Sequence, residues 1–232
     1  MQSAAAANNP GLTVGGVTPF TTIDFPGHLA AVIFCQGCPW RCRYCHNPHL
    51  LPTQSSGQYP WAEVISLLES RKGLLDGVAI SGGEPLLQRY LVESIGQIRD
   101  MGFEIALHTS GVAPKRFKDV LPAVDWVGLD IKAPFDEYDA ITGGGEASGM
   151  HAREVLIDLL ASGKPHELRC TLDLAFFTPE RAAKMATQLV ELGADHLIVQ
   201  ECRDNETHRG QPIPADIKAE LERILPKVEY RA

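Results

Sequence analysis

The chain has 232 residues, of which 44% are hydrophobic and 22% charged, and its formal net charge is −8. These values are typical of a globular protein, and no apolar run approaches the ~20 residues that a membrane-spanning helix needs. The acidic balance, without any sustained basic run, argues against binding to nucleic acid or to an anionic membrane. The expected partners are therefore small molecules or another protein.

The length suits one domain, which we expect over residues 13–232 with a helix near its C-terminal end. Residues 1–12 contain an alanine run and lack the basic and apolar regions of a secretory signal. We expect a flexible N-terminal tail and a cytoplasmic protein. Four of the six cysteines lie within residues 35–45, which in a reducing compartment indicates metal binding and not disulfide pairing.

Apolar runs of strand length alternate along the chain with longer segments of helical period. This alternation is typical of repeated βα units around a parallel sheet. The expected strands are Ala30–Cys35, Gly77–Ile80, Glu104–His108, Trp126–Asp130, Glu167–Leu172 and His196–Gln200. The expected helices are Trp61–Ser70, Leu86–Asp100, Pro114–Leu121, Ala152–Ala161 and Pro179–Leu192.

A further helix is expected over about 214–225, where it would close the bottom of a barrel or an edge of the sheet. The glycine-dense stretch 143–149 is expected to be a loop. Six βα units are fewer than the eight of a closed barrel. We therefore expect an α/β fold, an incomplete (β/α)6 TIM-like barrel with parallel strands, whose open side could admit a large substrate. An open doubly wound sheet is the alternative.

The cysteine cluster follows the first expected strand with the spacing C-x2-C-x3-C-x2-C. A zinc site made from two C-x2-C pairs needs a longer separation between the pairs than three residues. A ferredoxin-type site would use all four thiolates, but the order of the gaps differs from the bacterial pattern. The third interpretation takes only Cys38, Cys42 and Cys45 as ligands of a four-iron cluster and leaves one iron open for substrate chemistry. Cys35 ends a strand and is expected to be a buried apolar thiol.

Three other strand ends carry candidate binding residues. The second expected strand leads into Gly82-Gly83-Glu84-Pro85, where glycines allow close approach and Glu84 could face an ammonium group. The alternative is a plain strand-to-helix turn, with Glu84 at the helix dipole and Pro85 at the first helical position. The fourth expected strand ends in Asp130-Ile131-Lys132, whose two charged side chains share one face.

The fifth expected strand has one polar face, formed by Glu167, Arg169 and Thr171, and one apolar face. A central parallel strand is normally apolar on both faces. The pattern therefore favours an interior that faces a ligand, with a partly exposed edge strand as the alternative.

The C-x3-C-x-aromatic-C segment with Tyr44 resembles the signature of the radical S-adenosylmethionine (SAM) superfamily. The resemblance implies a [4Fe–4S] cluster on Cys38, Cys42 and Cys45, with SAM on the open iron and Tyr44 beside its adenine. Gly82, Gly83 and Glu84 resemble the motif that binds the amino group of SAM.

Residues 13 to about 200 resemble the activating enzymes of glycyl radical enzymes, and most of all those of anaerobic ribonucleoside-triphosphate reductase. Asp130 and Lys132 match a segment near SAM, and Arg169 is expected to contact SAM as well. Thr109 falls in a segment that is Asp-Thr-Asn-Gly in pyruvate formate-lyase activase. Here His108 replaces the acidic residue, and its role is open.

The resemblance implies that an electron from a low-potential donor such as flavodoxin enters the cluster and cleaves SAM. The resulting 5′-deoxyadenosyl radical would take a hydrogen atom from a glycine of the partner enzyme. The alternatives are a pyruvate formate-lyase type of activase, a radical SAM enzyme with a small substrate, similar to the carboxy-deazaguanine synthases, and a saturated iron–sulfur electron carrier.

Overall fold

The computed structural model describes residues 11–203 and 209–231. Most of the expected N-terminal tail lies outside these residues. The chain divides into two compact units. The first comprises the chain up to Pro39, His49–Thr109 and Lys115–Val127; the second comprises Trp40–Pro48, Ser110–Pro114 and the chain from Gly128 onward. This division does not test the expectation of one domain over 13–232, which stays a prediction.

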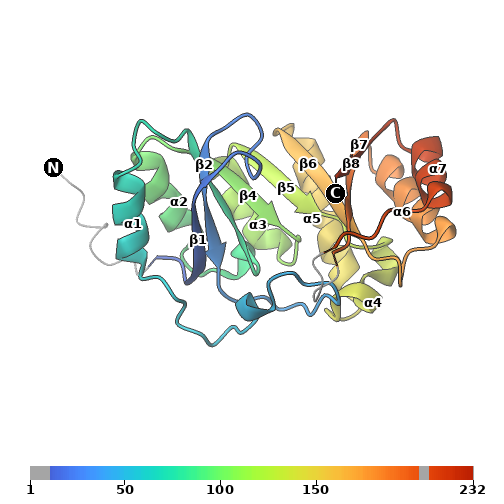
Figure 1. The fold of residues 1–232 in the computed structure, drawn as a ribbon, viewed down its shortest axis with the longest axis horizontal. Coiled ribbons are helices and arrows are strands. Elements are labelled where there is room, and N and C mark those ends of the chain that lie inside the picture. The colour runs from blue at the N-terminus through green and yellow to red at the C-terminus, as the bar shows by residue number, and fades with distance from the viewer. Residues whose placement is uncertain (1–10, 204–208, 232) are drawn as a thin grey trace. The chain divides into compact units, whose positions relative to one another are not determined.

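Eight strands occur in the described residues, in the sheet order β1 to β8, and β1 is not paired with β8 (Figure 1). The α/β fold with an unclosed, mostly parallel sheet is thereby confirmed. The strands are β1 (Val14–Thr21), β2 (Ala30–Cys35), β3 (Gly77–Gly82), β4 (Glu104–Thr109), β5 (Trp126–Asp130), β6 (His166–Leu172), β7 (His196–Glu201) and β8 (Lys227–Arg231).

All six expected strands are present, and two further strands, β1 and β8, were not predicted. The helices are α1 (Trp61–Glu69), α2 (Leu91–Asp100), α3 (Pro114–Val120), α4 (Tyr138–Thr142), α5 (Ser148–Ser162), α6 (Pro179–Glu191) and α7 (Ala215–Ile224). None of the helices in the described ranges combines the length and apolarity needed to span a bilayer.

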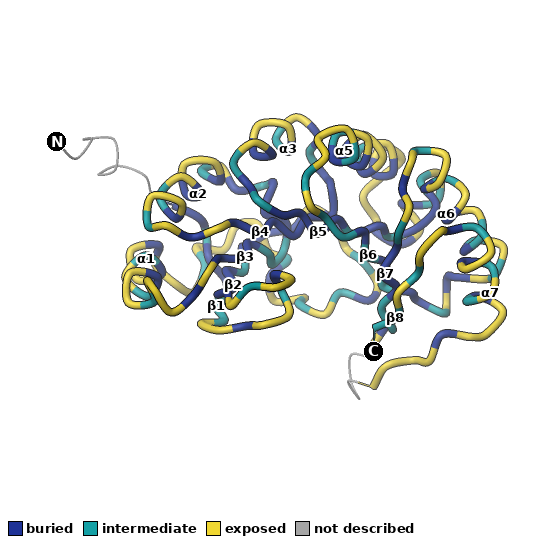
Figure 2. Tube along the Cα trace, turned by 90° about the horizontal axis from the view of Figure 1, so that it is seen from above, coloured by how far each residue is buried: buried dark blue, intermediate teal, exposed yellow. Residues whose placement is uncertain are grey.

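In the first unit, β1 pairs antiparallel with β2, whereas β2, β3 and β4 pair in parallel. Figure 2 shows α2 and α3 on one side of these strands. Most apolar side chains of β2, β3 and β4 are buried, as is usual where both faces of a parallel sheet are covered. One such cluster comprises Phe25, Ala30, Val32, Ala79, Ala106 and Trp126.

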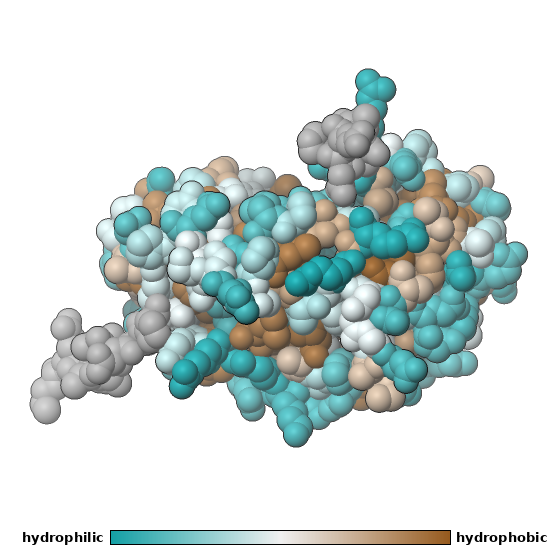
Figure 3. All heavy atoms as spheres, turned by 90° about the horizontal axis from the view of Figure 1, so that it is seen from below, coloured by the Kyte–Doolittle hydropathy of each residue, from teal (hydrophilic) through white to brown (hydrophobic). Residues whose placement is uncertain are grey.

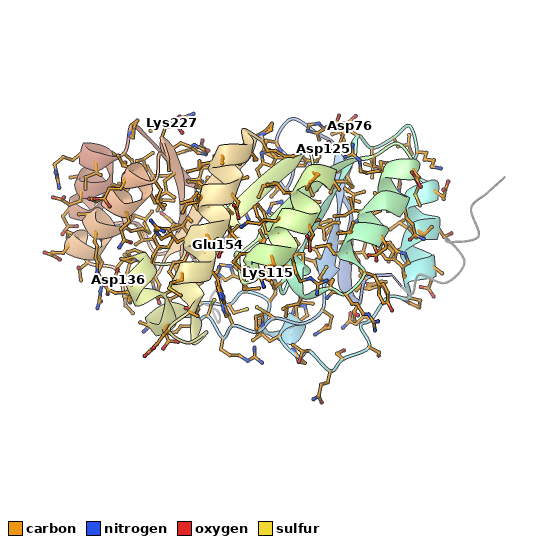
Figure 4. The ribbon with its side chains drawn as sticks, turned by 180° about the vertical axis from the view of Figure 1, so that it is seen from behind. Asp76, Lys115, Asp125, Asp136, Glu154 and Lys227 are labelled. Atoms are coloured by element: carbon orange, nitrogen blue, oxygen red, sulfur yellow. The ribbon has the colours of Figure 1, made fainter. Side chains whose placement is uncertain are left out.

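Two aspartates fix the beginnings of strands in the first unit. The Asp76 carboxylate accepts a hydrogen bond from the Leu29 backbone N–H at 2.8 Å, and the Asp125 carboxylate accepts one from Ile105 N–H at 2.8 Å. Both aspartates lie at the same end of this unit (Figure 4). Each carboxylate satisfies a backbone donor of the preceding strand, which helps to set the strand register.

In the second unit, β6, β7 and β8 pair in parallel, and α6 and α7 lie on one side of β7 and β8 (Figure 2). Leu168, Cys170 and Leu172 of β6 are fully buried, while the polar face of β6 is half-buried. The alternation predicted for this strand is therefore confirmed. Of the two roles predicted for α7, closing an edge of the sheet is wrong, because β8 lies beyond β7 and α7 packs against α6.

Two expected boundaries differ in the structure. The helix expected over Leu86–Asp100 is a 3-10 turn, Pro85–Leu87, followed by α2, because Gln88 is extended. Its side chain amide donates to Gln36 O at 2.8 Å and accepts from Thr13 N–H at 2.9 Å, which holds the break in place. The helix expected from Ala152 begins four residues earlier, at Ser148, so the glycine-rich loop is shorter than predicted.

Candidate functional site

Cys35 is the last residue of β2 and has no exposed surface. Burial, and secondly the nearby carboxylate of Glu84, raise the pKa of its thiol far above the ordinary value. A thiol that resists ionisation is a poor metal ligand. The prediction that Cys35 is a buried apolar thiol is confirmed.

Backbone hydrogen bonds hold the chain immediately before and at Cys38. Gly37 N–H donates to Leu50 O at 2.7 Å, and Cys38 N–H donates to Leu51 O at 3.2 Å. Cys38 itself is only 8% exposed. The start of the cysteine loop is therefore fixed by the protein.

The two glycines after β3 lie against the end of β2. A Cβ atom on Gly82, whose φ is +114°, would approach Cys35 N to 2.3 Å, and one on Gly83 would approach Gly37 O to 2.3 Å. Gly83 N–H also donates to Cys35 O at 2.9 Å. Within the first unit, these two positions require glycine because their backbone lies directly against the backbone of Cys35 and Gly37.

Glu84 plays the capping role considered for it, and its contact with an ammonium group stays a prediction. Its side chain has no exposed surface and caps the following 3-10 turn by accepting from Leu86 N–H at 2.9 Å, with Pro85 at the first position. Thr109, at the end of β4, donates its hydroxyl to the same carboxylate oxygen at 2.6 Å. The structure therefore brings the predicted residues Glu84 and Thr109 together in a buried position.

His108 has a structural partner. Its Nε2 lies 2.6 Å from Asp24 O, and its ring lies 5.2 Å from that of Trp126. The imidazole therefore ties β4 to the turn that follows β1.

The second unit contains the other two candidate ligands, Cys42 and Cys45, in a turn. Cys45 N–H donates to Cys42 O at 3.1 Å, and both thiols are partly exposed. Burial raises the pKa of Cys42, while the ammonium group of Lys132 acts in the opposite direction. A nearby cation of this kind stabilises a thiolate ligand.

Asp130, Lys132 and Arg169 form one charged cluster. The Asp130 carboxylate accepts from Arg169 at 3.0 Å and from Lys132 at 3.3 Å. Burial alone would lower the pKa of Lys132, but Asp130 and the neighbouring Tyr44 and Cys42 raise it well above its ordinary value. Two cations and one carboxylate leave a net positive charge that is suited to an anionic group.

Tyr44 adjoins this cluster. The Lys132 ammonium lies 5.8 Å from the centre of the Tyr44 ring, within the range of a cation–π contact. The Tyr44 hydroxyl and Arg169 Nε are both buried without a hydrogen-bond partner. Buried polar atoms that lack partners are costly, so this pair indicates a polar ligand beside the cluster.

The predicted site residues thus fall into two sets, one in each unit. Cys38, Gly82, Gly83, Glu84 and Thr109 belong to the first unit, and Cys42, Tyr44, Cys45, Asp130, Lys132 and Arg169 to the second. Within residues 11–203 and 209–231, no three Cys, His, Asp or Glu side chains stand as a ready metal-binding group. The assignment of the three cysteines as ligands is accordingly a proposal.

A polar cavity of about 190 Å³ lies at the C-terminal ends of β6 and β7, and sequence analysis missed it as a whole. Its lining side chains all carry hydrogen-bonding groups; they are His46, Thr171, Gln200, Glu201 and Arg203. The surface viewed from below in Figure 3 is mixed, with polar side chains bordering apolar ones. The position of Gln200 and Glu201 at a parallel strand end was the available signal.

Comparison with known proteins gives one family. The model of the radical SAM superfamily matches residues 32–181. The chain is 33% identical over 128 residues to a protein of Methanocaldococcus jannaschii named provisionally as a glycyl-radical enzyme activating enzyme. It is 35% identical over 130 residues to the pyruvate formate-lyase-activating enzyme of Clostridium pasteurianum.

These matches cover 54% and 53% of this chain, and 52% and 54% of the respective relatives. The chain therefore spans about half the length of the relatives that it matches. Among solved structures, QueE from Escherichia coli superimposes with a TM-score of 0.60 over the full length of both chains, at 14% identity. A likeness at that identity shows a shared fold.

Proposed function

The chain belongs to the radical SAM superfamily, and from that premise we propose that it activates a glycyl radical enzyme. As a radical SAM enzyme, it uses a [4Fe–4S] cluster and S-adenosylmethionine. The observation that carries the proposal is the identity of 33–35% with relatives that are named as activating enzymes.

The side chains of both units fit these two groups. Cys38, Cys42 and Cys45 supply soft thiolate ligands, which iron–sulfur clusters require. The positive excess at Lys132 and Arg169, with an unpartnered Arg169 Nε, suits the carboxylate of SAM.

We assign the remaining predicted residues to the other parts of SAM. Glu84, buried and braced by Thr109, suits the ammonium group, and Gly82 and Gly83 form the turn that presents it. Tyr44, with a buried hydroxyl, suits the adenine.

A cluster held by Cys38, Cys42 and Cys45, with SAM bound beside it, would supply the radical chemistry needed to remove a hydrogen atom from a glycine Cα of the partner. The chain's own residues orient the reactants. Lys132 is held by Asp130, and Asp130 by Arg169, so the cation is fixed before SAM binds. Such preorganisation lowers the entropic cost of aligning SAM with the cluster.

The partner is an anaerobic ribonucleotide reductase or a pyruvate formate-lyase. The sequence resemblance over residues 13 to about 200 favours the reductase, whereas a 35% identical relative is named for the lyase. A low-potential carrier such as flavodoxin would deliver the electron.

The test is anaerobic reconstitution with iron and sulfide, followed by dithionite and SAM. We expect methionine and 5′-deoxyadenosine, and a glycyl radical signal in the electron paramagnetic resonance (EPR) spectrum when one of the two partners is added. The variant Cys42→Ser, which removes one proposed ligand, should give no 5′-deoxyadenosine and no glycyl radical signal. Production of 5′-deoxyadenosine without a radical on either partner would contradict the activase proposal.

A small-molecule substrate is the second candidate, favoured by the polar cavity in the second unit. The polar cavity at Thr171, Gln200 and Glu201 could hold such a substrate. The appearance of a new metabolite from a cell extract without any partner protein would favour this candidate.

A further inference from the structure

The short helix α4 packs against the part of the cysteine loop that precedes Cys42. Arg41 N–H donates to Thr142 O at 2.7 Å, at the C-terminal end of α4. The ring of Trp40 lies edge-on to that of Tyr138, at the first position of α4, with centres 5.9 Å apart. Trp40 and Tyr138 are 4% and 1% exposed, so this contact is part of the core of the second unit.

The same tyrosine also contacts the strand end that carries the charged cluster. Its hydroxyl accepts a hydrogen bond from the Lys132 backbone N–H at 3.0 Å. Burial raises the pKa of this hydroxyl far above its ordinary value, so it stays neutral. One side chain therefore joins the backbone of Lys132 to the ring of Trp40.

A glycine makes room for this arrangement. A Cβ atom on Gly144 would lie 2.4 Å from Trp40 Nε1, so any larger residue would displace the indole. Gly144 N–H donates to the Thr142 hydroxyl at 3.2 Å, and that hydroxyl in turn donates to Tyr138 O at 2.8 Å. The contact surface for Trp40 is thus built by α4 and the residues directly after it.

We propose that Tyr138 is a positioning residue, which sets the spacing between the cysteine loop and Lys132 through its hydroxyl on Lys132 and its ring on Trp40. The inference rests on the cluster and SAM sites proposed above. It does not depend on which partner or substrate receives the radical.

The test is Tyr138→Phe in the reconstituted holoenzyme, which keeps the ring and removes the hydroxyl. We expect unchanged iron and sulfide content and a dissociation constant for SAM that rises about fivefold, because SAM must then immobilise a Lys132 side chain that the protein holds less firmly. The constant is measured from the change in the EPR spectrum of the reduced cluster as SAM is added. The rate of 5′-deoxyadenosine formation at saturating SAM should change by less than about twofold.

Tyr59→Phe is the matched control, because Tyr59 is 42% exposed and lies in the first unit. It should bind SAM like the unmodified enzyme. A purely structural role for Tyr138 would lower the melting temperature or the iron content and leave SAM affinity unchanged, and that result would overturn the inference.

Gly144→Ala displaces the Trp40 indole and leaves the Tyr138 hydroxyl in place. This variant tests the inference if Tyr138→Phe loses its iron–sulfur cluster, so that its SAM affinity cannot be measured. We expect this variant to weaken SAM binding as well, and an unchanged dissociation constant would overturn the inference. Failure of the unmodified holoenzyme to bind SAM would refute both the proposed function and this inference. Equal SAM binding by the unmodified enzyme and both variants would refute the inference alone.

Discussion

Burial separates the roles of cysteines that are neighbours in sequence. Cys35 is enclosed at the end of β2, whereas Cys42 and Cys45 are partly exposed in a turn. Burial raises the pKa of the Cys42 thiol, and the nearby Lys132 cation opposes that rise. These environments assign an apolar role to Cys35 and leave Cys42 and Cys45 available for iron.

Cys35→Ala should therefore retain the cluster. We expect the iron content and the visible absorption of the anaerobically reconstituted protein to match those of the unmodified protein. The loss of buried contacts should lower the free energy of unfolding by about 1–2 kcal/mol, measured by denaturant titration. Cys42→Ala is the control and should lose iron; loss of iron from Cys35→Ala would instead support a saturated electron carrier.

At the scale of elements, apolar runs of strand length predict the strands whose two faces are both buried. They miss β1, whose sequence contains two glycines and a proline, residues that are normally depleted in strands. The antiparallel edge position of β1 tolerates them, and that position is visible only in the fold. They also miss β8, a five-residue strand that follows α7 without an apolar run.

The sequence predicts the candidate ligands and charged residues of the site better than it predicts the contacts that hold them in place. The spacing of Cys38, Cys42 and Cys45 and the charges of Asp130 and Lys132 are explicit in the sequence. No local pattern predicts that Tyr138 contacts Trp40, because the two residues are far apart in the chain and meet only through tertiary packing. The hydrogen bond between Thr109 and Glu84 is hidden for the same reason.

The contact between α6 and the 3-10 turn Phe135–Glu137 (η5) depends on charge. Lys184 donates to both Asp136 and Glu137, and these hydrogen bonds lower the pKa of each carboxyl group. Figure 4 labels Asp136, the middle residue of this turn. A carboxyl group with a lowered pKa in the folded state stabilises the fold above its unfolded pKa, and this contribution is lost as the pH falls through the folded value.

Lys184→Met should raise the pKa values of Asp136 and Glu137 towards ordinary values, measured by NMR titration of their carboxyl carbons. At neutral pH the variant should be less stable by about 0.2–1 kcal/mol, since these groups are exposed. The difference from the unmodified protein should shrink as the pH falls to about 3 and below. A difference that stays constant from neutral to acidic pH would show that Lys184 acts through packing and not through charge.

At the scale of the whole molecule, each compact unit is assembled from three separate segments of the chain. The second unit includes Trp40–Pro48, which lies far in sequence from the rest of that unit. Besides Trp40 and Arg41, this segment contributes Arg43, whose guanidinium pairs with Asp173 at 2.6 Å. A continuous piece of chain from Gly128 onward therefore lacks part of the second unit.

A fragment of residues 128–232 should be unstable for this reason. Without Trp40, the Tyr138 ring loses a core contact, and removal of a buried tryptophan typically costs about 3–5 kcal/mol. We expect a broad, weakly cooperative thermal transition by circular dichroism, in contrast to the full chain. Addition of a synthetic peptide of residues 40–48 should raise the melting temperature, and a sharp transition of the fragment alone would contradict this expectation.

The segment from Cys35 to Cys38 is hydrogen-bonded on several sides, to Gly83, Glu84, Leu50 and Leu51. This has a consequence for how the chain can tolerate changes of length. An inserted or deleted residue between these cysteines would move each donor away from its acceptor and leave several buried amides without partners. Length variation is better accommodated at residues 53–56, which are exposed and lie outside every helix and strand. Engineered tags or reporter loops should be introduced there.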